Sequence, residues 1–287
     1  MRFRFIFRHA QQFSIVMMCA ALGVSRSGYY AWRKRLPSAR AQANERLSTH
    51  IQTVFDWSRN TYGYRRIHAA LVDQGVGCGR NRVARLMRLA GLQGRRRRRY
   101  QVTTQSRHNL PVAPNRLARD FLALAPNQKW VSDITYVRTG QGWLFLAAIL
   151  DLYARLVVGW AIESYLTERL TLKALHMALN RRRPLPGMLH HSDRGSQYAS
   201  TRYQVLLASQ QVVTSMSRKG NAYDNAPMES FFATLKTELI HRRHYQTHRE
   251  ARVDIFEYIE VFYNRQRRHS ALHYLTPADY DSLFVTP

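Results

Sequence analysis

The sequence predicts an α/β protein in which a layered domain with a mixed sheet follows small all-α units and precedes a C-terminal helical extension. From Trp130 onward, apolar runs of strand length alternate with segments of helical spacing, which is typical of packed sheet and helix layers. Before Trp130 the apolar spacing is helical and the segment is strongly basic. With 45% apolar residues over 287 positions, the chain is long enough for one full domain and smaller ones.

The charge of the chain is unusual in both size and distribution. It has 44 Lys and Arg residues against 18 Asp and Glu, a net charge of +26, and only five of the 44 are Lys. Residues 1–120 hold 24 of these cations and only four acids. The pattern predicts a polyanionic partner, most commonly nucleic acid, because Arg grips phosphate with a planar fork. A ribosomal-type basic protein is the alternative, but such proteins rarely need an apolar domain with carboxylates at strand ends.

The cellular compartment follows from the cysteines and the first apolar run. Cys19 and Cys78 are too few for a disulfide framework or a four-ligand zinc site, which fits a reducing cytosol. Residues 13–24 are apolar and follow three arginines, as in a secretory signal, but they are too short to span a bilayer and lack a good cleavage context. We therefore expect a cytoplasmic, nucleoid-associated protein with no membrane partner.

The N-terminal region predicts two small helix-turn-helix units. In the first, a helix ends near Leu22, residues 24–28 form a turn, and a second helix starts at Tyr29. In the second, residues 64–72 and 81–90 have helical spacing on either side of a Gly-rich break. One face of the latter helix is apolar and the other carries arginines, so it can bury one side and offer the other to a DNA groove. A merely solvated basic face is the alternative.

Several arginines are candidates for contacts with DNA phosphates. An uninterrupted five-Arg run should not form a packed element, because its like charges repel. Together with the residues that follow, it indicates a linker that holds phosphates, each of which would steepen the salt dependence of binding. The candidates are Arg65, Arg66, Arg80, Arg82, Arg85, Arg88, Arg95, Arg96, Arg97, Arg98, Arg99 and Arg194.

The second half of the chain predicts three strands, helix, strand, helix, strand, helix and a final helix. The expected strands are residues 131–137, 143–150, 156–162, 188–191 and 212–214. The expected helices are residues 167–180, 202–209, 226–240 and 249–268. The chain is thus divided into an N-terminal helical segment 1–45, a helix-turn-helix domain 46–100, a linker 101–125, a catalytic core 126–240 and a C-terminal helical extension 241–287.

Three acidic residues define the candidate catalytic site. Asp133 lies within the first expected strand, Asp193 follows the fourth, and Glu229 is on the helix expected to pack nearby. Adjacent strands bring such positions together at one sheet edge, and three converging carboxylates repel unless cations lie between them. Hard oxygen ligands with open positions suit Mg²⁺ or Mn²⁺. Two such ions can activate an attacking hydroxyl and stabilise the leaving oxygen of a phosphodiester.

Lys236 follows Glu229 by two helical turns and shares its face. We expect it to contact phosphate beside the metals. Each carboxylate alone is more simply a cap or a surface acid, but three in distinctive settings make that interpretation unlikely to hold for all.

Other chemistry-bearing residues near these positions have weaker interpretations. His190 and His191 precede Asp193 but have no further zinc ligands at short spacing, so we expect them to support the site or face DNA. Asp151 is either a fourth acid near the site or a turn-forming residue. Ser192 and Ser196 lack a nucleophile elbow, and Tyr223 lacks the Arg and His residues that a covalent tyrosine mechanism needs.

At these residues the chain resembles the bacterial insertion-sequence transposases related to retroviral integrases, and within them the second-reading-frame protein of the IS-three group. The resemblance covers nearly the whole chain. It is carried by residues 130–136 (WVSDITY), 190–198 (HHSDRGSQY) and 221–232 (NAYDNAPMESFF), by residues 61–67 (TYGYRRI), and by the C-terminal positions Tyr263, Asn264, Arg268, His269, Ser270, Leu272 and Pro277.

The resemblance implies a ribonuclease H-like core with Asp133, Asp193 and Glu229 as the metal-binding DDE triad. It implies hydrolytic nicking at the element's ends, followed by attack of the freed 3′-hydroxyl on target DNA, without a covalent enzyme intermediate. The implied partners are the terminal inverted repeats, target DNA, further copies of the chain, and a fused upstream-frame product. Residues 13–15 (FSI) depart from the expected FPV, which concerns the first helical unit.

Two other functions compete with transposition. A non-catalytic DNA-binding regulator would rely on the basic N-terminal half alone, and its function would survive loss of Glu229. A ribonuclease H-like nuclease that cuts without joining would use the same carboxylates but would form no joined product. The full triad argues against the regulator, and the N-terminal DNA-binding units argue against the nuclease.

Overall fold

The computed structural model describes residues 1–94, 110–219 and 221–284, and it contains two compact units, residues 1–52 and 53–287. Each unit is described by itself. The α-helices are α1 (Arg2–His9), α2 (Ile15–Ala21), α3 (Arg26–Lys34), α4 (Ala39–Trp57), α5 (Tyr64–Asp73), α6 (Arg80–Leu89), α7 (Glu168–Arg182), α8 (Ser196–Ala199), α9 (Thr201–Ser209), α10 (Ala226–Glu238), α11 (His248–Phe256) and α12 (Pro277–Ser282). The strands are β1 (Lys129–Thr139), β2 (Gly142–Asp151), β3 (Leu156–Glu163), β4 (Leu189–Ser192) and β5 (Val213–Met216).

The first unit contains helices α1 to α3 around a small aromatic and aliphatic core. Ile6, Cys19 and Tyr29 are buried, with Phe3 and Trp32 packed against them. Helix α3 begins at Arg26 and not at Tyr29 as expected. The reason is that the Ser25 side chain accepts a hydrogen bond from the Gly28 amide at 3.0 Å, which caps the helix one turn earlier.

Helices α5 and α6 form the helix-turn-helix pair of the second unit, with bounds within one residue of those expected. Their apolar spacing buries Ile67 and Leu71 on one helix and Val83 and Leu86 on the other. Of the arginines on α6, Arg80, Arg85 and Arg88 are exposed and Arg82 is partly buried. The run Arg95–Arg99 lies outside the described residues.

The five strands form one mixed sheet with the order β3-β2-β1-β4-β5, preceded and interrupted by helices in the expected sequence. Strands β1, β2 and β3 pair antiparallel, as short turns allow, whereas β1, β4 and β5 pair parallel through helical crossovers. The expected order of strands and helices in this domain is confirmed.

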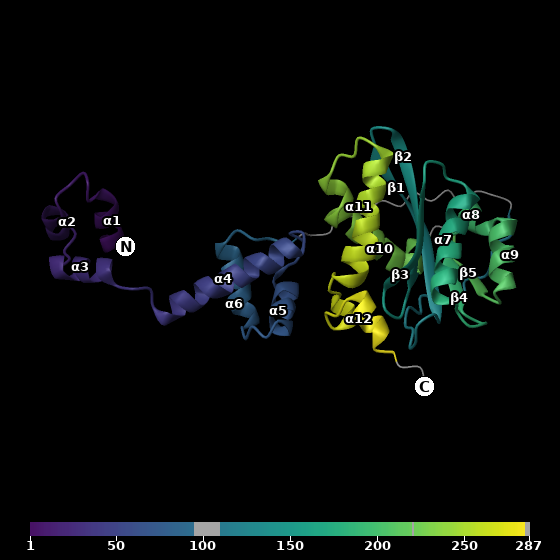
Figure 1. Ribbon diagram of the computed structural model, residues 1–287, viewed down its shortest axis with the longest axis horizontal. Helices are drawn as coiled ribbons and strands as arrows, with labels where there is room; N and C mark the ends of the chain where they lie inside the picture. Colours follow the sequence, from purple (N-terminus) through teal and green to yellow (C-terminus); the bar gives the residue numbers. More distant parts are fainter. Residues whose placement is uncertain (95–109, 220, 285–287) are drawn as a thin grey trace. The chain divides into compact units, whose positions relative to one another are not determined.

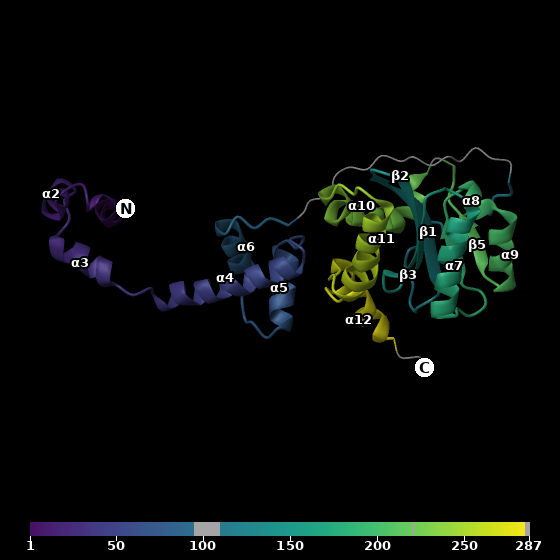
Figure 2. The same cartoon turned by 45° about the horizontal axis from the view of Figure 1, so that its top comes forward.

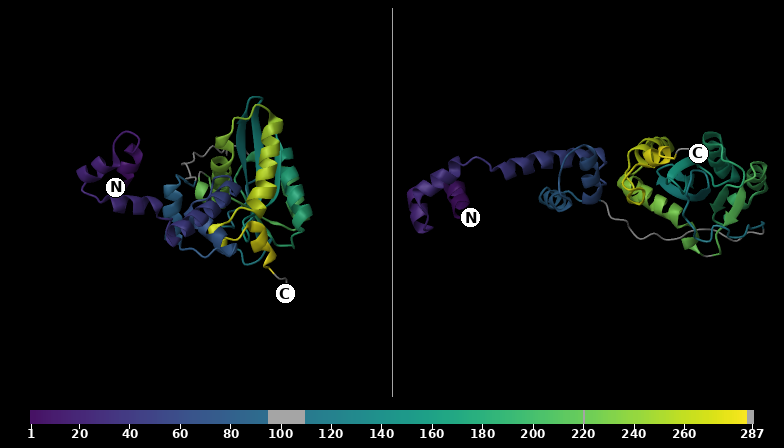
Figure 3. Two further views of the ribbon diagram at one scale, coloured as in Figure 1. Left: turned by 60° about the vertical axis from the view of Figure 1, so that its left-hand side comes forward. Right: turned by 90° about the horizontal axis from the view of Figure 1, so that it is seen from below.

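Helices cover both faces of the sheet (Figure 1). Helices α7 and α9 pack over one apolar cluster, which includes Ile149 and Leu175, and helices α10 and α11 pack over the other, which includes Val131 and Phe231. Figures 2 and 3 show the same three layers from other sides, with the C-terminal helices and α9 on opposite faces of the sheet. Gly159 of β3 lets α7 approach closely, because a Cβ there would collide with the Ala174 carbonyl oxygen and the Ala178 side chain.

The segments before and after the core are attached to it by specific contacts. The described part of the expected linker, from Leu110, is held by the Ser215 hydroxyl, which accepts hydrogen bonds from the amides of Arg116 and Leu117. The expected final helix is divided: α11 ends at Phe256 and a π-helical segment, Glu257–Tyr263, follows. The π-helical segment buries four large side chains together: Tyr258, Ile259, Phe262 and Tyr263.

Candidate active site

The pairing of β1 with β4 places Asp133 beside Asp193. Val131 lies opposite His191 in the parallel ladder. Asp133 and Asp193 each follow these residues by two positions, in the same direction. Because side chains alternate across a strand, Asp133 points to the same face as Val131, and Val131 packs in the cluster shared with α10. Strand pairing therefore aims the first aspartate at the helix that carries Glu229 and Lys236.

The start of α10 is fixed to the same strand. The Asn225 side chain donates a hydrogen bond to the Ser132 carbonyl at 2.9 Å, and Pro227 occupies the first turn of the helix, where a missing amide costs nothing. Each aspartate also accepts a hydrogen bond from a backbone amide close to it in sequence: Asp133 Oδ1 accepts from the Ile134 amide at 2.7 Å, and Asp193 Oδ1 accepts from the Gly195 amide at 2.8 Å.

The four predicted residues interact electrostatically. Burial raises the pKa of Asp133 well above its ordinary value, and the negative charges of Asp193 and Glu229 raise it further, while Lys236 opposes them. Burial also raises the pKa of Glu229. Burial lowers the pKa of Lys236, whose ammonium lies 5.7 Å from the centre of the Tyr136 ring, and Asp133 partly offsets that shift. Among the described residues, these side chains thus bring three carboxylates near one ammonium, which makes the local charge net negative.

The carboxylates are near neighbours but not a closed ligand cage. Across the described residues, no three His, Cys, Asp or Glu side chains are gathered into a group that could hold a metal ion.

The two histidines before Asp193 are buried and do not face DNA, so that part of the expectation is wrong. His190 bonds the Tyr203 hydroxyl at 3.1 Å, and burial lowers its pKa to about 3. His191 bonds the hydroxyls of Ser215 and Ser217 at 2.8 and 3.0 Å, and burial lowers its pKa to about 4. Both are neutral at pH 7 and join β4 to its neighbours.

Asp151 is the turn-forming residue of the two alternatives. It is buried at the end of β2, accepts hydrogen bonds from the amides of Asn127 and Tyr153, and lies 3.6 Å from Arg182. Tyr223 is 72% exposed with the Arg119 guanidinium 5.8 Å from its ring centre, and no histidine among the described residues is recorded in contact with it.

Sequence reasoning missed Asp224, which organises the loop before α10. It is buried, and it accepts hydrogen bonds from Asn115, from the Arg119 side chain and from the amide and side chain of Arg218. Hydrogen bonds from Arg218 lower the pKa of Asp224 strongly, ahead of those from Arg119. The sequence offered one signal for Asp224: it lies in the family-like segment 221–232, of which only Glu229 was given a role.

Several of the arginines predicted to bind DNA also contact other parts of the protein. Arg66 lies 3.8 Å from Glu238 and 5.6 Å from the Tyr62 ring centre. The Arg194 side chain donates to the Ser217 carbonyl at 2.6 Å. Arg65 is exposed and stacks on Tyr64.

Comparisons with known proteins define the class. An integrase core domain model matches residues 123–222, a second integrase core domain model matches residues 229–283, and an HTH-like domain model matches residues 42–100. This combination, with the fold described above, is that of a DDE-type polynucleotidyl transferase that acts on DNA.

The relatives define the family. The chain is 51% identical to the insertion element IS600 uncharacterized 31 kDa protein of Shigella sonnei, over 91% of this chain and 96% of that protein. It is 41% identical to the transposase InsF for insertion sequence IS3A of Escherichia coli K12, over 98% and 99%. The chain therefore belongs to the IS3-type family of insertion-element transposases, which confirms the resemblance found in the sequence.

A weaker similarity exists to the HTLV-2 integrase catalytic core domain in complex with magnesium. It has 16% identity and a TM-score of 0.43, and it covers 56% of this chain and 99% of that one. This similarity is too weak to support a functional inference.

No helix of the described residues is long and apolar enough to cross a membrane.

Proposed function

We propose that this insertion-element transposase cuts the ends of its element and joins the freed 3′-hydroxyl to target DNA at the site formed by Asp133, Asp193 and Glu229. The observation that carries the proposal is the strand register that sets Asp133 beside Asp193 on the face covered by α10. The raised pKa of Asp133, caused by burial and then by the charges of Asp193 and Glu229, supports it, because strongly perturbed pKa values are typical of functional sites.

The three carboxylates fit Mg²⁺ or Mn²⁺, of which we expect two ions. Their oxygens are hard donors, and no sulfur ligand lies among them. Metal ions bound there would activate the attacking hydroxyl and stabilise the leaving oxygen. The residues of the chain would position the reactants: Asp133 comes from β1, Asp193 from the loop after β4, and Glu229 from α10.

Lys236 has the role of a phosphate contact. It lies two turns after Glu229 on α10, beside Tyr136, with its charge near Asp133. Burial lowers its pKa, so a phosphate that approaches it would replace lost solvation and favour the charged ammonium.

The partners follow from the reaction. The substrates are the terminal inverted repeats and target DNA, which the exposed arginines of α6 and Arg65 are suited to bind. Two ends must be processed together, so we infer an active complex of at least two copies. A fusion with an upstream-frame product would add a further DNA-binding and dimerising segment. We place the protein in the bacterial cytoplasm, at the nucleoid.

A strand-transfer assay tests the proposal. The parent chain, alone and fused to the upstream-frame product, is supplied with element-end DNA and Mg²⁺ or Mn²⁺. We expect Asp193→Asn to lower joining at least about 100-fold, because it removes an electrostatic contact made in the transition state. Asp120→Asn, which alters a carboxylate that is 67% exposed and pairs with Lys129, is the matched control.

Three outcomes discriminate between functions. Joining by Asp193→Asn at the parent's rate would sink the proposal. Cutting without joining, when cut ends are supplied, would indicate a nuclease. Full biological function of Glu229→Gln would indicate a regulator that only binds DNA.

A further inference from the structure

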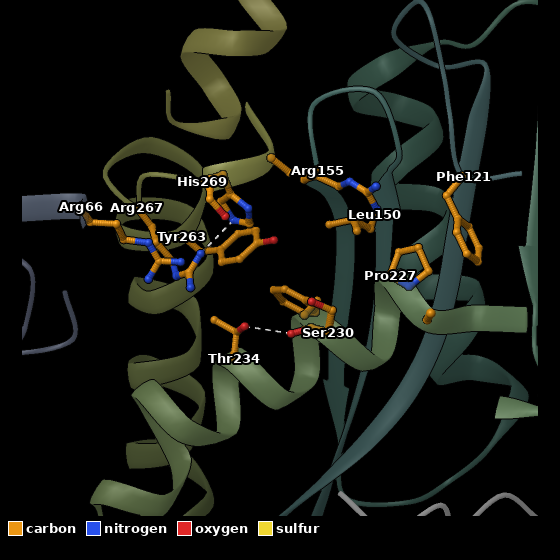
Figure 4. Close-up of a pocket in the computed structure, with 14 residues that line it drawn as sticks. Arg66, Phe121, Leu150, Arg155, Pro227, Ser230, Thr234, Tyr263, Arg267 and His269 are labelled. Carbon is orange, nitrogen blue, oxygen red and sulfur yellow. Dashed lines mark hydrogen bonds between the residues drawn. The ribbon is translucent and has the colours of Figure 1, made fainter. Parts of the chain in front are cut away.

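We propose that the cavity bordered by Arg66, Arg155 and Arg267, beside α10, binds a phosphate group (Figure 4). The group is either a backbone phosphate of DNA or a free phosphate compound. The DNA source rests on the function proposed above, whereas the phosphate site itself does not.

The cavity has the size and lining of a binding site. Its volume is about 360 Å³, within the usual range for small-molecule pockets. No acidic residue is present among the described residues that line it, while three are arginines and one is His269. The hydroxyls of Ser230, Thr234 and Ser270 also line it. Figure 4 shows Arg66 and Arg267 on one side, Arg155 on another, and Ser230 and Thr234 along α10.

Arg155 is the residue that most directly indicates an anion. It ends the turn between β2 and β3 with a left-handed backbone, φ 55°, which is unfavourable for a residue with a side chain and is commonly retained at functional positions. Within the described part of the chain its guanidinium has no carboxylate partner, and burial lowers its pKa. A half-buried cation without a carboxylate partner has lost part of its hydration, and a bound oxyanion would offset that cost.

Arg66 and Arg267 add further positive charge because they share a single carboxylate. Glu238 accepts two hydrogen bonds from Arg267, both at 2.8 Å, and lies 3.8 Å from Arg66. The Arg267 guanidinium also donates to the His269 ring at 3.0 Å. With Arg155 included, the described residues place three guanidinium groups at this cavity, and the acid that pairs with two of them is Glu238.

The cavity and the catalytic carboxylates meet different faces of the same helix. Residues Ala226, Ser230 and Thr234 of α10 line the cavity and repeat at four-residue intervals along one face. Glu229 and Lys236 repeat at seven and lie on another face. A DNA strand held at the catalytic face can therefore place a neighbouring phosphate at this cavity without displacing the metal site.

The test compares two arginines of equal charge and similar backbone. Arg155→Asn removes the proposed contact, and Asn tolerates the left-handed conformation, so folding should survive. Arg183→Asn is the control, because Arg183 is exposed at the end of α7 with φ 45°. Arg155→Lys keeps the charge and should retain part of the binding. Thermal unfolding of each full-length variant checks the fold.

The probes are inorganic phosphate and a short DNA duplex, each titrated at several salt concentrations. For a DNA source, Arg155→Asn lowers the slope of log affinity against log salt by about 0.9, the value for one phosphate, and Arg183→Asn lowers it less. For a free-phosphate source, Arg155→Asn weakens inorganic phosphate binding roughly tenfold and leaves the DNA slope equal to that of the control.

Either result supports the phosphate site, and behaviour of Arg155→Asn identical to Arg183→Asn with both probes overturns it. Neither result depends on strand transfer. Failure of the catalytic proposal would appear only in the Asp193→Asn assay, so the two failures are distinguishable.

Discussion

Helix α10 begins and ends with acidic residues in opposite environments. Near its start, Glu229 is partly buried, and burial raises its pKa. At its end, Glu238 is buried, and although burial alone would raise its pKa, the charge and hydrogen bonds of Arg267 lower it. The comparison teaches that burial does not by itself identify a functional acid. A carboxylate paired with a protein cation stabilises the fold, whereas the raised pKa of Glu229 fits its proposed role as a metal ligand.

The largest expected effect is that of removing the Glu238 charge at the end of α10, which is paired with Arg267. Glu238→Gln should destabilise the folded chain by about 3–5 kcal/mol, because Arg267 would remain buried without a counter-charge. Arg267 is 3% exposed, and the Tyr258 hydroxyl donates to the same carboxylate at 2.9 Å. Urea unfolding of parent and variant measures the change. A loss below about 1 kcal/mol, the range of exposed ion pairs, would show that this pair is not structural.

The stabilisation by bound Mg²⁺ should depend on the acidic residues near the start of α10 and not on Glu238. Mg²⁺ should stabilise the parent by about 2.7 kcal/mol when free metal is 100 times the Kd, through preferential binding to the folded state. Thermal unfolding with and without Mg²⁺ measures this. Asp193→Asn should lose most of this stabilisation, and Glu238→Gln should retain all of it, because the gain depends on the metal concentration and Kd and not on the stability of the variant. Equal Mg²⁺ responses in the parent and Asp193→Asn would contradict the assigned site.

Removal of the Asp133 charge should stabilise the folded chain. Asp133→Asn should raise the free energy of unfolding by ~0.5–2 kcal/mol at pH 7, as is common where function maintains strain. The sign follows from the pKa of Asp133, which is raised in the folded state by burial and by Asp193 and Glu229. The folded chain binds the Asp133 proton more tightly than the unfolded chain does. The ionised carboxylate therefore lowers the free energy of unfolding at pH values above the folded pKa.

The pH dependence of Asp133→Asn provides its control. As pH falls through the folded pKa toward the ordinary value of about 3.9, the parent takes up the proton and the difference between parent and variant should disappear. Urea unfolding across this pH range measures it. A difference that grows on acidification would contradict the direction of the shift.

The sheet and the proximity of Asp133 to Asp193 were predictable from sequence because both depend on local patterns, whereas the role of Asp133, Asp193 and Glu229 as a catalytic triad stays a prediction. Continuous apolar runs predicted the strands. The proximity of Asp133, within β1, to Asp193, directly after the adjacent strand β4, followed from their positions at the two runs. The histidines were less predictable, because the burial of His190 and His191 depends on hydroxyls of Tyr203, Ser215 and Ser217 from other elements. Nothing in a local window reports such partners.

The matched acid and the cavity were unpredictable for the same reason. Glu238 and Arg267 are 29 residues apart, and Arg66 comes from a different segment altogether. Asn264, noted in the sequence only through its family pattern, hydrogen-bonds the amide and carbonyl of Val157. Long-range polar pairs of this kind have no periodicity that a sequence window could show.

The smallest expected effect concerns an ion pair that is exposed. Glu257 is 54% exposed and pairs with Arg59 at 2.5 Å. Glu257→Gln should cost no more than about 1 kcal/mol, since solvent screens the charges. In ~1 M salt, where the Debye length is about 3 Å, the cost should vanish. The cost of Glu238→Gln should persist, because its partners are buried away from salt. Urea unfolding at low and high salt measures both costs. Equal salt sensitivity of the two variants would mean that burial does not protect the Glu238–Arg267 pair from screening.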